Sequence, residues 1–187
     1  MTLSFAIEPL EKCWSEVMFL AKQHWHETEE YRHGEKFNPN YLLYRQYESA
    51  GLFFLATARA NGAMVGYAGM YVTPSMHTQR MIATEDTWFL LPEYRKGWNA
   101  VRFYKFVENE CLRRLAIGCG MTVKNTNGAS KVLEFLGYKE VSRQYYKHLV
   151  DMPVKQSNNP SKGRADSALA RNSKESSDVR TKSTARS

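Results

Sequence analysis

Residues 90–106, LLPEYRKGWNAVRFYKF, join the end of a β pattern to the start of a helical pattern. Pro92 turns the chain, and a basic corner of Arg95, Lys96 and Gly97 follows it. A strand, a tight turn and a helix start leave several backbone N–H groups unpaired at one point, together with the positive end of the helix dipole. This arrangement predicts an anion site, most naturally for phosphate. The alternative is that Arg95 and Lys96 form a solvated turn before an ordinary amphipathic helix.

The composition bounds the class of protein. With 187 residues, of which 43% are apolar and 24% charged, the chain is long enough for one well-buried soluble domain and little more. It has no uncharged apolar run of about 18 residues, and residues 1–8 lack both a basic region and a long apolar segment. We therefore expect neither a membrane span nor a secretory signal.

Cysteine and histidine usage indicates a reducing setting and no metal. Cys13, Cys111 and Cys119 are odd in number and widely spaced, which builds neither a disulfide framework nor a metal knuckle. His24 and His26 lack the i,i+4 spacing that puts two imidazoles on one helix face, so we expect no metal site. A cytoplasmic location is the simplest interpretation.

The composition changes after residue 152. Residues 151–187 hold 8 of the 26 Lys and Arg and 4 of the 19 Asp and Glu, so they carry +4 of the total net charge of +7. They are rich in serine and have almost no large apolar side chains, so burial cannot offset their ordering entropy. We expect a folded domain at 1–152 and a disordered, basic, Ser-rich tail at 153–187. Weak contact with nucleic acid is an alternative to a purely solvating role for this tail.

Periodicity predicts an ordered series of strands and helices in the domain. Asn61 and Gly62 are a strong hairpin signal between two β patterns, and Gly51, Gly118 and Gly137 stand where helical patterns stop. We expect strands at 3–8, 53–59, 63–72, 81–91 and 119–124, helices from 10 to about 25, from 41 to about 50, at 99–115 and at 129–136, and terminal strands at 139–144 and 145–150.

The run at 88–97, WFLLPEYRKG, resembles the central motif of the GNAT superfamily of N-acetyltransferases. In that motif a hydrophobic-x-hydrophobic-x-Pro-x-Tyr-Arg strand end leads into a turn of the form Arg/Gln-x-x-Gly-x-Gly/Ala. Ala100 fits the last place of the turn, but Trp98 stands where the first glycine is expected, and Gly97 comes one residue early. A tryptophan keeps the backbone away from a pyrophosphate unless its ring swings aside. The Tyr-Arg-Lys-Gly corner also resembles acetyltransferases encoded by bacteriophages.

A second motif follows in the order that the family has it. The segment 127–138, NGASKVLEFLGY, resembles Asn-x-x-Ala-x-x-hydrophobic-Tyr-x-x-x-Gly-Phe/Tyr, with Leu133 at the tyrosine position. The resemblance covers about residues 1–150 and implies a GNAT-like α/β fold of the α+β type. This fold has a mixed, mainly antiparallel central sheet with helices on both faces. In the family the first helix pair overhangs the acceptor side, where the aromatic side chains would be Trp25, Phe37, Tyr41 and Tyr44.

The resemblance also implies a co-substrate and an assembly. In the family the strand backbone binds the pantetheine arm and the acetyl carbonyl of acetyl-CoA, and the turn binds its pyrophosphate. A terminal strand often pairs two copies, so a homodimer is one option. Carried over, the cofactor-binding residues are Leu90, Arg95, Lys96, Gly97, Trp98, Asn99, Ala100 and Asn127.

Acetyl transfer to an amine needs a base, because an ammonium must lose a proton before its nitrogen can attack. The candidates are Glu85 and Asp86, which are neighbours on one strand and therefore face opposite ways. On a regular strand Asp86 shares a face with Trp88 and Leu90, whereas the bulge usual in the family reverses this in favour of Glu85. Both stay candidates, and the alternative for each is a solvated or salt-bridged carboxylate.

The return of a proton to the CoA thiolate is less well provided for. The family often uses the tyrosine of the second motif, and Leu133 at that position has no proton to donate. Tyr138, Tyr145, Tyr146 or water are the alternatives. Because a thiolate is already a fair leaving group, the loss of this acid slows the reaction without abolishing it.

We therefore expect an N-acetyltransferase that moves an acetyl group from acetyl-CoA to an unidentified amine, which is either a small molecule or a protein. Trp98, Leu133 and the basic tail motivate a rival interpretation. The rival is a catalytically inactive GNAT-fold binding protein, phage-encoded and acting on a host protein or nucleic acid.

Overall fold

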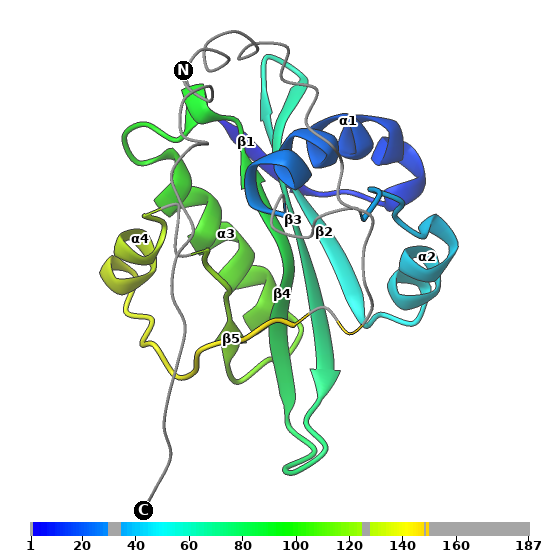
Figure 1. The fold of residues 1–187 in the computed structure, drawn as a ribbon, viewed down its shortest axis with the longest axis vertical. Coiled ribbons are helices and arrows are strands. Elements are labelled where there is room, and N and C mark those ends of the chain that lie inside the picture. The colour runs from blue at the N-terminus through cyan, green and yellow to red at the C-terminus, as the bar shows by residue number, and fades with distance from the viewer. Residues whose placement is uncertain (1, 30–34, 125–127, 148, 150–187) are drawn as a thin grey trace, which may run out of the picture. The chain divides into compact units, whose positions relative to one another are not determined.

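Five strands form one sheet in the order β1-β2-β3-β4-β5 (Figure 1). The computed structural model describes residues 2–29, 35–124, 128–147 and 149. The first three pairings are antiparallel, and β4 pairs with β5 in parallel. The expected mixed, mainly antiparallel sheet is confirmed. The strands are β1 (Ser4–Ile7), β2 (Phe53–Ala60), β3 (Ala63–Pro74), β4 (Met81–Leu90) and β5 (Cys119–Gly120).

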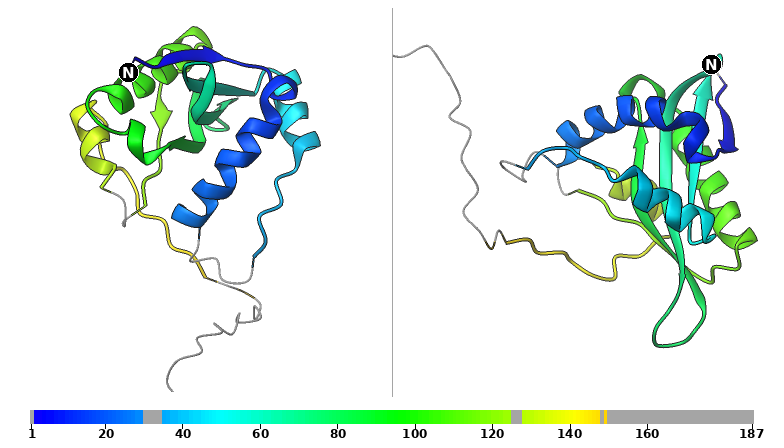
Figure 2. Two further views of the ribbon diagram at one scale, coloured as in Figure 1. Left: turned by 90° about the horizontal axis from the view of Figure 1, so that it is seen from above. Right: turned by 90° about the vertical axis from the view of Figure 1, so that its right-hand side faces the viewer.

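Helices cover both faces of the sheet, as the two views of Figure 2 show. Helix α1 packs on one face through Leu10, Val17 and Leu20, and α3 packs on the other through Phe103 and Val107. These spacings of three, four and seven residues are the helical periodicity that predicted both elements. The helices are α1 (Leu10–Thr28), α2 (Tyr41–Ser49), α3 (Asn99–Arg113) and α4 (Ser130–Phe135), with a 3-10 turn η1 (Pro92–Tyr94) before α3.

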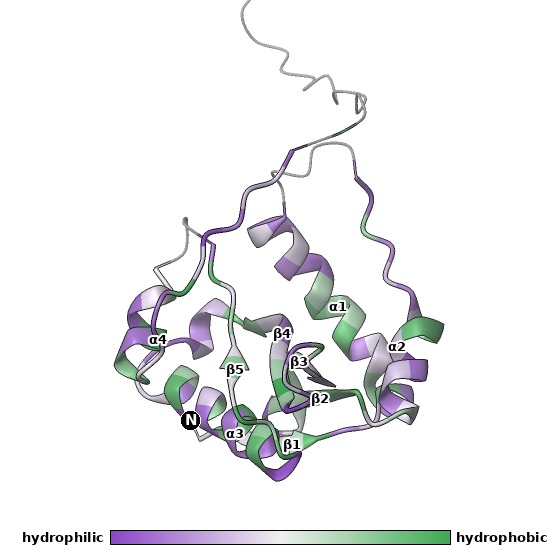
Figure 3. Ribbon diagram, turned by 90° about the horizontal axis from the view of Figure 1, so that it is seen from below, coloured by the Kyte–Doolittle hydropathy of each residue, from purple (hydrophilic) through white to green (hydrophobic). Residues whose placement is uncertain are grey.

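The middle strands are buried on both sides. On β2, Phe54 and Ala56 belong to the core beneath α3, whereas Phe53 and Leu55 belong to the core beneath α1. This alternation follows from the two-residue repeat of a strand. The helices carry both polar and apolar residues, as elements with only one face in a core do (Figure 3). Within the described ranges, no helix combines the length and apolar character that crossing a membrane requires.

Strand β4 carries a bulge at Asp86. Gly69 of β3 pairs with Thr87, and Met70 pairs with Glu85, so Asp86 is the extra residue on β4. A bulge shifts the alternation of side chains, so residues before and after it no longer follow one regular pattern. The bulge that the family resemblance implied is therefore present, at the second of the two candidate carboxylates.

Strand β5 meets β4 at only two positions, where Ala83 pairs with Cys119 and Thr84 with Gly120. The predicted strand at 119–124 is therefore too long, because residues 121–124 leave β4 without regular structure. Glu85 is the next residue of β4, and its carboxylate accepts the backbone N–H of Thr122. A side chain thus replaces the backbone ladder there. The β4–β5 ladder therefore ends at Thr84 and Gly120, and the unpaired region between the second half of β4 and residues 121–124 is called the gap below.

The predicted terminal strands at 139–144 and 145–150 are wrong where the structure describes them. Residues 139–147 and 149 form no strand, and every side chain from 139 to 147 is exposed. An alternating pattern stabilises a strand only when one face is packed and the backbone is paired, and this segment has neither. Residues 148 and 150 and the predicted tail at 153–187 lie outside the described residues.

Gly66 of β3 lets β3 and β4 approach closely at the end of β4. A Cβ atom on Gly66 would lie 2.7 Å from Leu90 Cδ1 and 2.7 Å from the carbonyl oxygen of Phe89. Real Cβ atoms do not make contacts this short, so any side chain here displaces the strand that leads into the basic turn.

We expect Gly66→Ala to lower the free energy of unfolding by about 1–3 kcal/mol, because it overpacks the β3–β4 contact. Denaturant unfolding measures the change. Gly118→Ala is the matched control, since its Cβ would meet only Ile82 Cγ2, at an ordinary 3.9 Å. The control should change stability by less than about 0.5 kcal/mol. Equal losses in the two variants would contradict the close approach at Gly66.

Candidate active site

Arg95 fastens the end of β4 to the end of α1. Its Nε donates to the carbonyl oxygen of Leu90 at 2.6 Å, and its two terminal nitrogens donate to the Glu27 carboxylate at 2.7 Å each. The guanidinium carbon also lies 5.3 Å from the centre of the Phe89 ring. Each of these three nitrogens thus donates to a protein group. Arg95 therefore holds the turn against β4 and α1 in this structure.

Unpaired backbone donors follow Arg95. Gly97 has a φ of +64°, a left-handed conformation that favours glycine, and Asn99 Nδ2 donates to the Tyr94 carbonyl oxygen at 3.1 Å. The backbone N–H groups of residues 96–101 donate to no other described residue. The first turn of α3 holds no acidic side chain, and its cap residue makes no side-chain hydrogen bond. These are the features on which the sequence-based prediction of an anion site depends.

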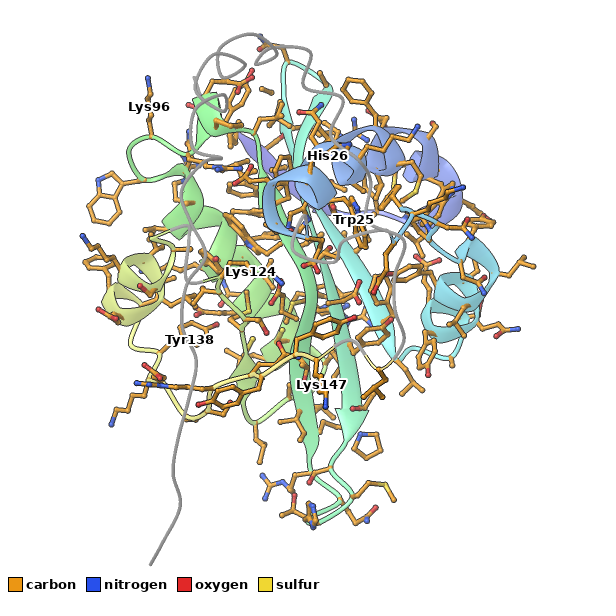
Figure 4. All side chains as sticks on the ribbon, in the orientation of Figure 1. Trp25, His26, Lys96, Lys124, Tyr138 and Lys147 are labelled. Carbon is orange, nitrogen blue, oxygen red and sulfur yellow. The ribbon has the colours of Figure 1, made fainter. Side chains whose placement is uncertain are left out.

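Lys96 and Trp98 extend from this turn in different directions. Lys96 points away from the domain into solvent (Figure 4). Trp98 is 65% exposed, and its ring centre lies 5.6 Å from that of Phe135 in α4. The tryptophan that departs from the family pattern is thus turned toward α4. The glycine with a left-handed backbone conformation is Gly97, one residue before the position where the family motif has its first glycine.

Glu85 lies where β4 and residues 121–124 part. Its Oε2 accepts the backbone N–H of Thr122 at 2.8 Å. Burial raises the pKa of Glu85 to about 7, the neighbouring charge of Asp86 adds to the rise, and the Thr122 bond and Lys124 oppose it. Ala83, two residues earlier on β4, belongs to the core beneath α3, so Glu85 faces the α3 side of the sheet.

Asp86 points to the opposite side, toward α1 and α2. Its Oδ2 accepts a hydrogen bond from the Tyr44 hydroxyl at 2.8 Å. Burial raises the pKa of Asp86, against the opposing effect of the Tyr44 bond. The carboxylate borders a cavity of about 400 Å³ between α1, the segment 36–39, α2 and the sheet. The two candidate carboxylates therefore lie on different sides of β4, with Glu85 at the gap and Asp86 at the cavity.

Sequence reasoning missed a buried pair beside this cavity. His24 Nδ1 and the Tyr67 hydroxyl are 3.0 Å apart, and the His24 ring stacks on Phe89 at 5.1 Å between ring centres. Burial lowers the pKa of His24 to about 4, so the imidazole is neutral at pH 7. On sequence alone, His24 is considered for a metal site and is assigned no part in the active site. Its helical spacing on the inward stripe of α1 is the signal from which this contact could have been inferred.

The second motif is only partly described. Asn127 lies outside the described residues. Leu133 is buried in α4, at 7% exposed. Of the three tyrosines considered as acids, Tyr138 contacts Cys119 at the start of β5, Tyr145 is 89% exposed, and Tyr146 donates to Glu35 Oε1 at 2.9 Å. Tyr138 is the one beside the strand that borders the gap.

The part of the chain that the structure describes contains no group of three or more His, Cys, Asp or Glu residues that could hold a metal ion.

Comparison with solved structures relates the fold to acetyltransferases. A ribosomal-protein-alanine N-acetyltransferase from Brucella melitensis biovar Abortus matches with a TM-score of 0.63 at 14% identity, over 81% of this chain and 100% of that one. An aminoglycoside acetyltransferase from an uncultured soil metagenomic sample matches at 0.64 and 16%, over 80% and 100%. A predicted acetyltransferase from Clostridium acetobutylicum, solved with acetyl-CoA, matches at 0.60 and 12%, over 79% and 97%. No protein-family model and no curated protein matches the chain.

At these identities the likeness shows the fold. The chain has the fold of these acetyltransferases along nearly their whole length, which confirms the GNAT-like architecture expected from the two motifs. The resemblance to bacteriophage acetyltransferases stays a prediction.

The Arg95–Glu27 ion pair is expected to contribute little on its own. A double-mutant cycle with Arg95→Ala and Glu27→Ala should give a coupling of about 0.5–1 kcal/mol in the free energy of unfolding, because the side chains are 36% and 34% exposed. Thermal or urea unfolding of the four proteins measures it. A coupling near zero would show that the bidentate contact does not hold β4 to α1.

Proposed function

We propose that this protein transfers an acetyl group from acetyl-CoA to the nitrogen of an amine. The observation that carries the proposal is the continuity of residues 85–101. Within this one stretch, the half-buried carboxylate of Glu85 lies where the β4–β5 ladder ends, and a turn whose backbone N–H groups have no described acceptor follows it. The shared fold supports it, as does the presence of acetyl-CoA in the Clostridium acetobutylicum structure.

The turn binds the pyrophosphate of CoA through the backbone N–H groups of residues 96–101, where the α3 dipole adds attraction. Lys96 adds a positive charge, and Arg95 and Asn99 hold the turn in shape. The pantetheine arm follows β4 near Leu90, in the gap toward residues 121–124. Trp98, Ala100 and Asn127 complete the set proposed for cofactor binding.

Glu85 acts as the general base. The amine nitrogen attacks the thioester carbonyl, a C–N bond forms, the C–S bond breaks, and CoA leaves as the thiolate. The proton lost by the nitrogen passes to Glu85, directly or through water. With a pKa of about 7, Glu85 is half ionised at neutral pH and still basic enough to take a proton. Tyr138, whose pKa burial raises, stays protonated and with water is the candidate for returning a proton to the thiolate.

A binding protein without transferase activity is the second candidate. Leu133 favours it, because a buried leucine stands where the family's proton donor is expected. Trp98 no longer favours it, since the ring is turned toward α4. Turnover of acetyl-CoA with any amine would exclude this candidate.

Gly97→Ala is expected to weaken CoA binding by about tenfold or more, because a residue with a Cβ resists the left-handed turn and misplaces the N–H groups. Titration calorimetry with CoA measures it. Gly51→Ala is the matched control: φ is +72° there and +64° at Gly97, and neither added Cβ would meet an atom within 4 Å. Gly51 follows α2, so its variant should keep CoA affinity within about twofold. Equal losses in both would contradict the pyrophosphate site.

The transfer rate should rise with pH through about 7, because the base works only after Glu85 has lost its proton. The titratable groups that interact electrostatically with Glu85 are Asp86, Lys124, Tyr67, Tyr104 and Cys119. Glu85→Gln should lower kcat by about 10²–10⁴-fold and remove this rise. The assay is CoA release with the fastest acceptor in a panel of primary amines. A rise that persists in Glu85→Gln would refute the assignment, and its loss in Asp86→Asn alone would move the role to Asp86.

A further inference from the structure

The cavity beside Asp86 has a lining of unusual character. Its volume is about 400 Å³, at the small end of ligand sites. Aromatic rings come from α1, from the segment 36–39, from α2 and from β3, together with aliphatic side chains of α1 and β2. The aromatic rings are those of Trp14, Trp25, Phe37, Tyr44 and Tyr67.

Within the described part of the chain, the Asp86 carboxylate has no counter-ion in this cavity. Tyr44 provides its hydrogen bond, and no Lys, Arg or His among the described residues forms an ion pair with it. The nearby His24 supplies no charge, because its imidazole is neutral at pH 7. A partly desolvated anion gains strongly from a cation that binds beside it. The aromatic faces around it attract the same kind of ligand.

We propose that this cavity binds a primary amine that carries a single ammonium group on an apolar, aromatic or aliphatic body, with Asp86 as the counter-ion of the ammonium. The inference rests on the proposed function, because it names the acceptor class for the same site. Asp86 directly follows Glu85 on β4. An amine held by Asp86 therefore lies one residue along β4 from Glu85, on the α1 and α2 side of the strand.

The charges and apolar walls of this cavity do not suit a ligand with several positive charges. Besides Asp86, the described acidic residue that lines the cavity is Glu29, and Lys124 Nζ lies 2.7 Å from Glu29 Oε1. Lys36 also lines the cavity and adds a positive charge. An aminoglycoside has several ammonium groups and a hydroxylated body, so it would leave most of its charges unpaired against apolar walls. The soil enzyme is named for aminoglycosides, whereas this cavity fits an acceptor of a different chemical class.

Tyr44 positions the counter-ion. Its hydroxyl holds Asp86 Oδ2, and its ring centre lies 6.0 Å from that of Trp14 and 5.3 Å from that of Phe53. Held in this way, the carboxylate keeps Oδ1 available for a ligand. The same packing fixes the aromatic wall against which the apolar body lies.

The test is calorimetric titration of the full chain, saturated with CoA, with phenethylamine, phenethyl alcohol and kanamycin. We expect phenethylamine to bind at least about tenfold more tightly than the alcohol, which has the same body without the charge, and kanamycin to bind more weakly than phenethylamine. Asp86→Asn should abolish the preference for the amine while leaving the affinity for CoA unchanged. Tyr44→Phe, which keeps the ring, should weaken amine binding by about two- to fivefold.

Glu134→Gln is the matched control, because it removes one negative charge from an exposed position on α4, outside the cavity. It should retain the amine preference. Equal binding of the amine and the alcohol, tighter binding of kanamycin, or an Asp86→Asn variant that behaves as wild type would overturn the inference. Amine binding through Asp86 in a protein with no CoA affinity would instead overturn the proposed function, so the two failures are distinguishable.

Discussion

Strand β4 pairs with β3 along its length but with β5 at only two positions, and the candidate site follows from this asymmetry. The β3 ladder and the close approach at Gly66 hold β4 rigidly in the sheet. From Glu85 onward its other edge has no regular partner strand in the described part of the chain, so half-buried backbone groups and a carboxylate border the gap. Backbone groups without partners are costly when they are buried, and a ligand that pairs with them removes this cost.

The bulge at Asp86 gives each side of β4 a different chemistry. On the side of the gap, Glu85 has its pKa raised to about 7 by burial, which suits proton transfer at neutral pH. On the side of α1 and α2, Asp86 sits among aromatic rings and is held by Tyr44. Adjacent carboxylates on a regular strand would also face opposite ways. The bulge adds the register that aligns Glu85 with the gap and Asp86 with the cavity.

Most of the fold could be predicted from the sequence, and so could the turn and the two carboxylates from which the site is proposed. The spacing of apolar residues and the Asn61-Gly62 turn located α1, α2, α3 and the β2–β3 hairpin, because these are local signals. The short β5 and the absence of terminal strands at 139–147 depended on tertiary pairing, which alternation alone does not encode. The sequence also predicted the anion turn. It could not reveal that Arg95 binds Glu27, since these residues lie far apart in the chain.

The central claim is that the backbone N–H groups of residues 96–101 bind the pyrophosphate of CoA. The most direct measurement follows the amide resonances of isotopically labelled protein during titration with CoA and, separately, with pantetheine, which lacks the phosphates. The account predicts that CoA shifts the amides of residues 96–101 and of Thr122, whereas pantetheine shifts Thr122 and leaves the turn unchanged. CoA titration that leaves the amides of residues 96–101 in place would contradict it.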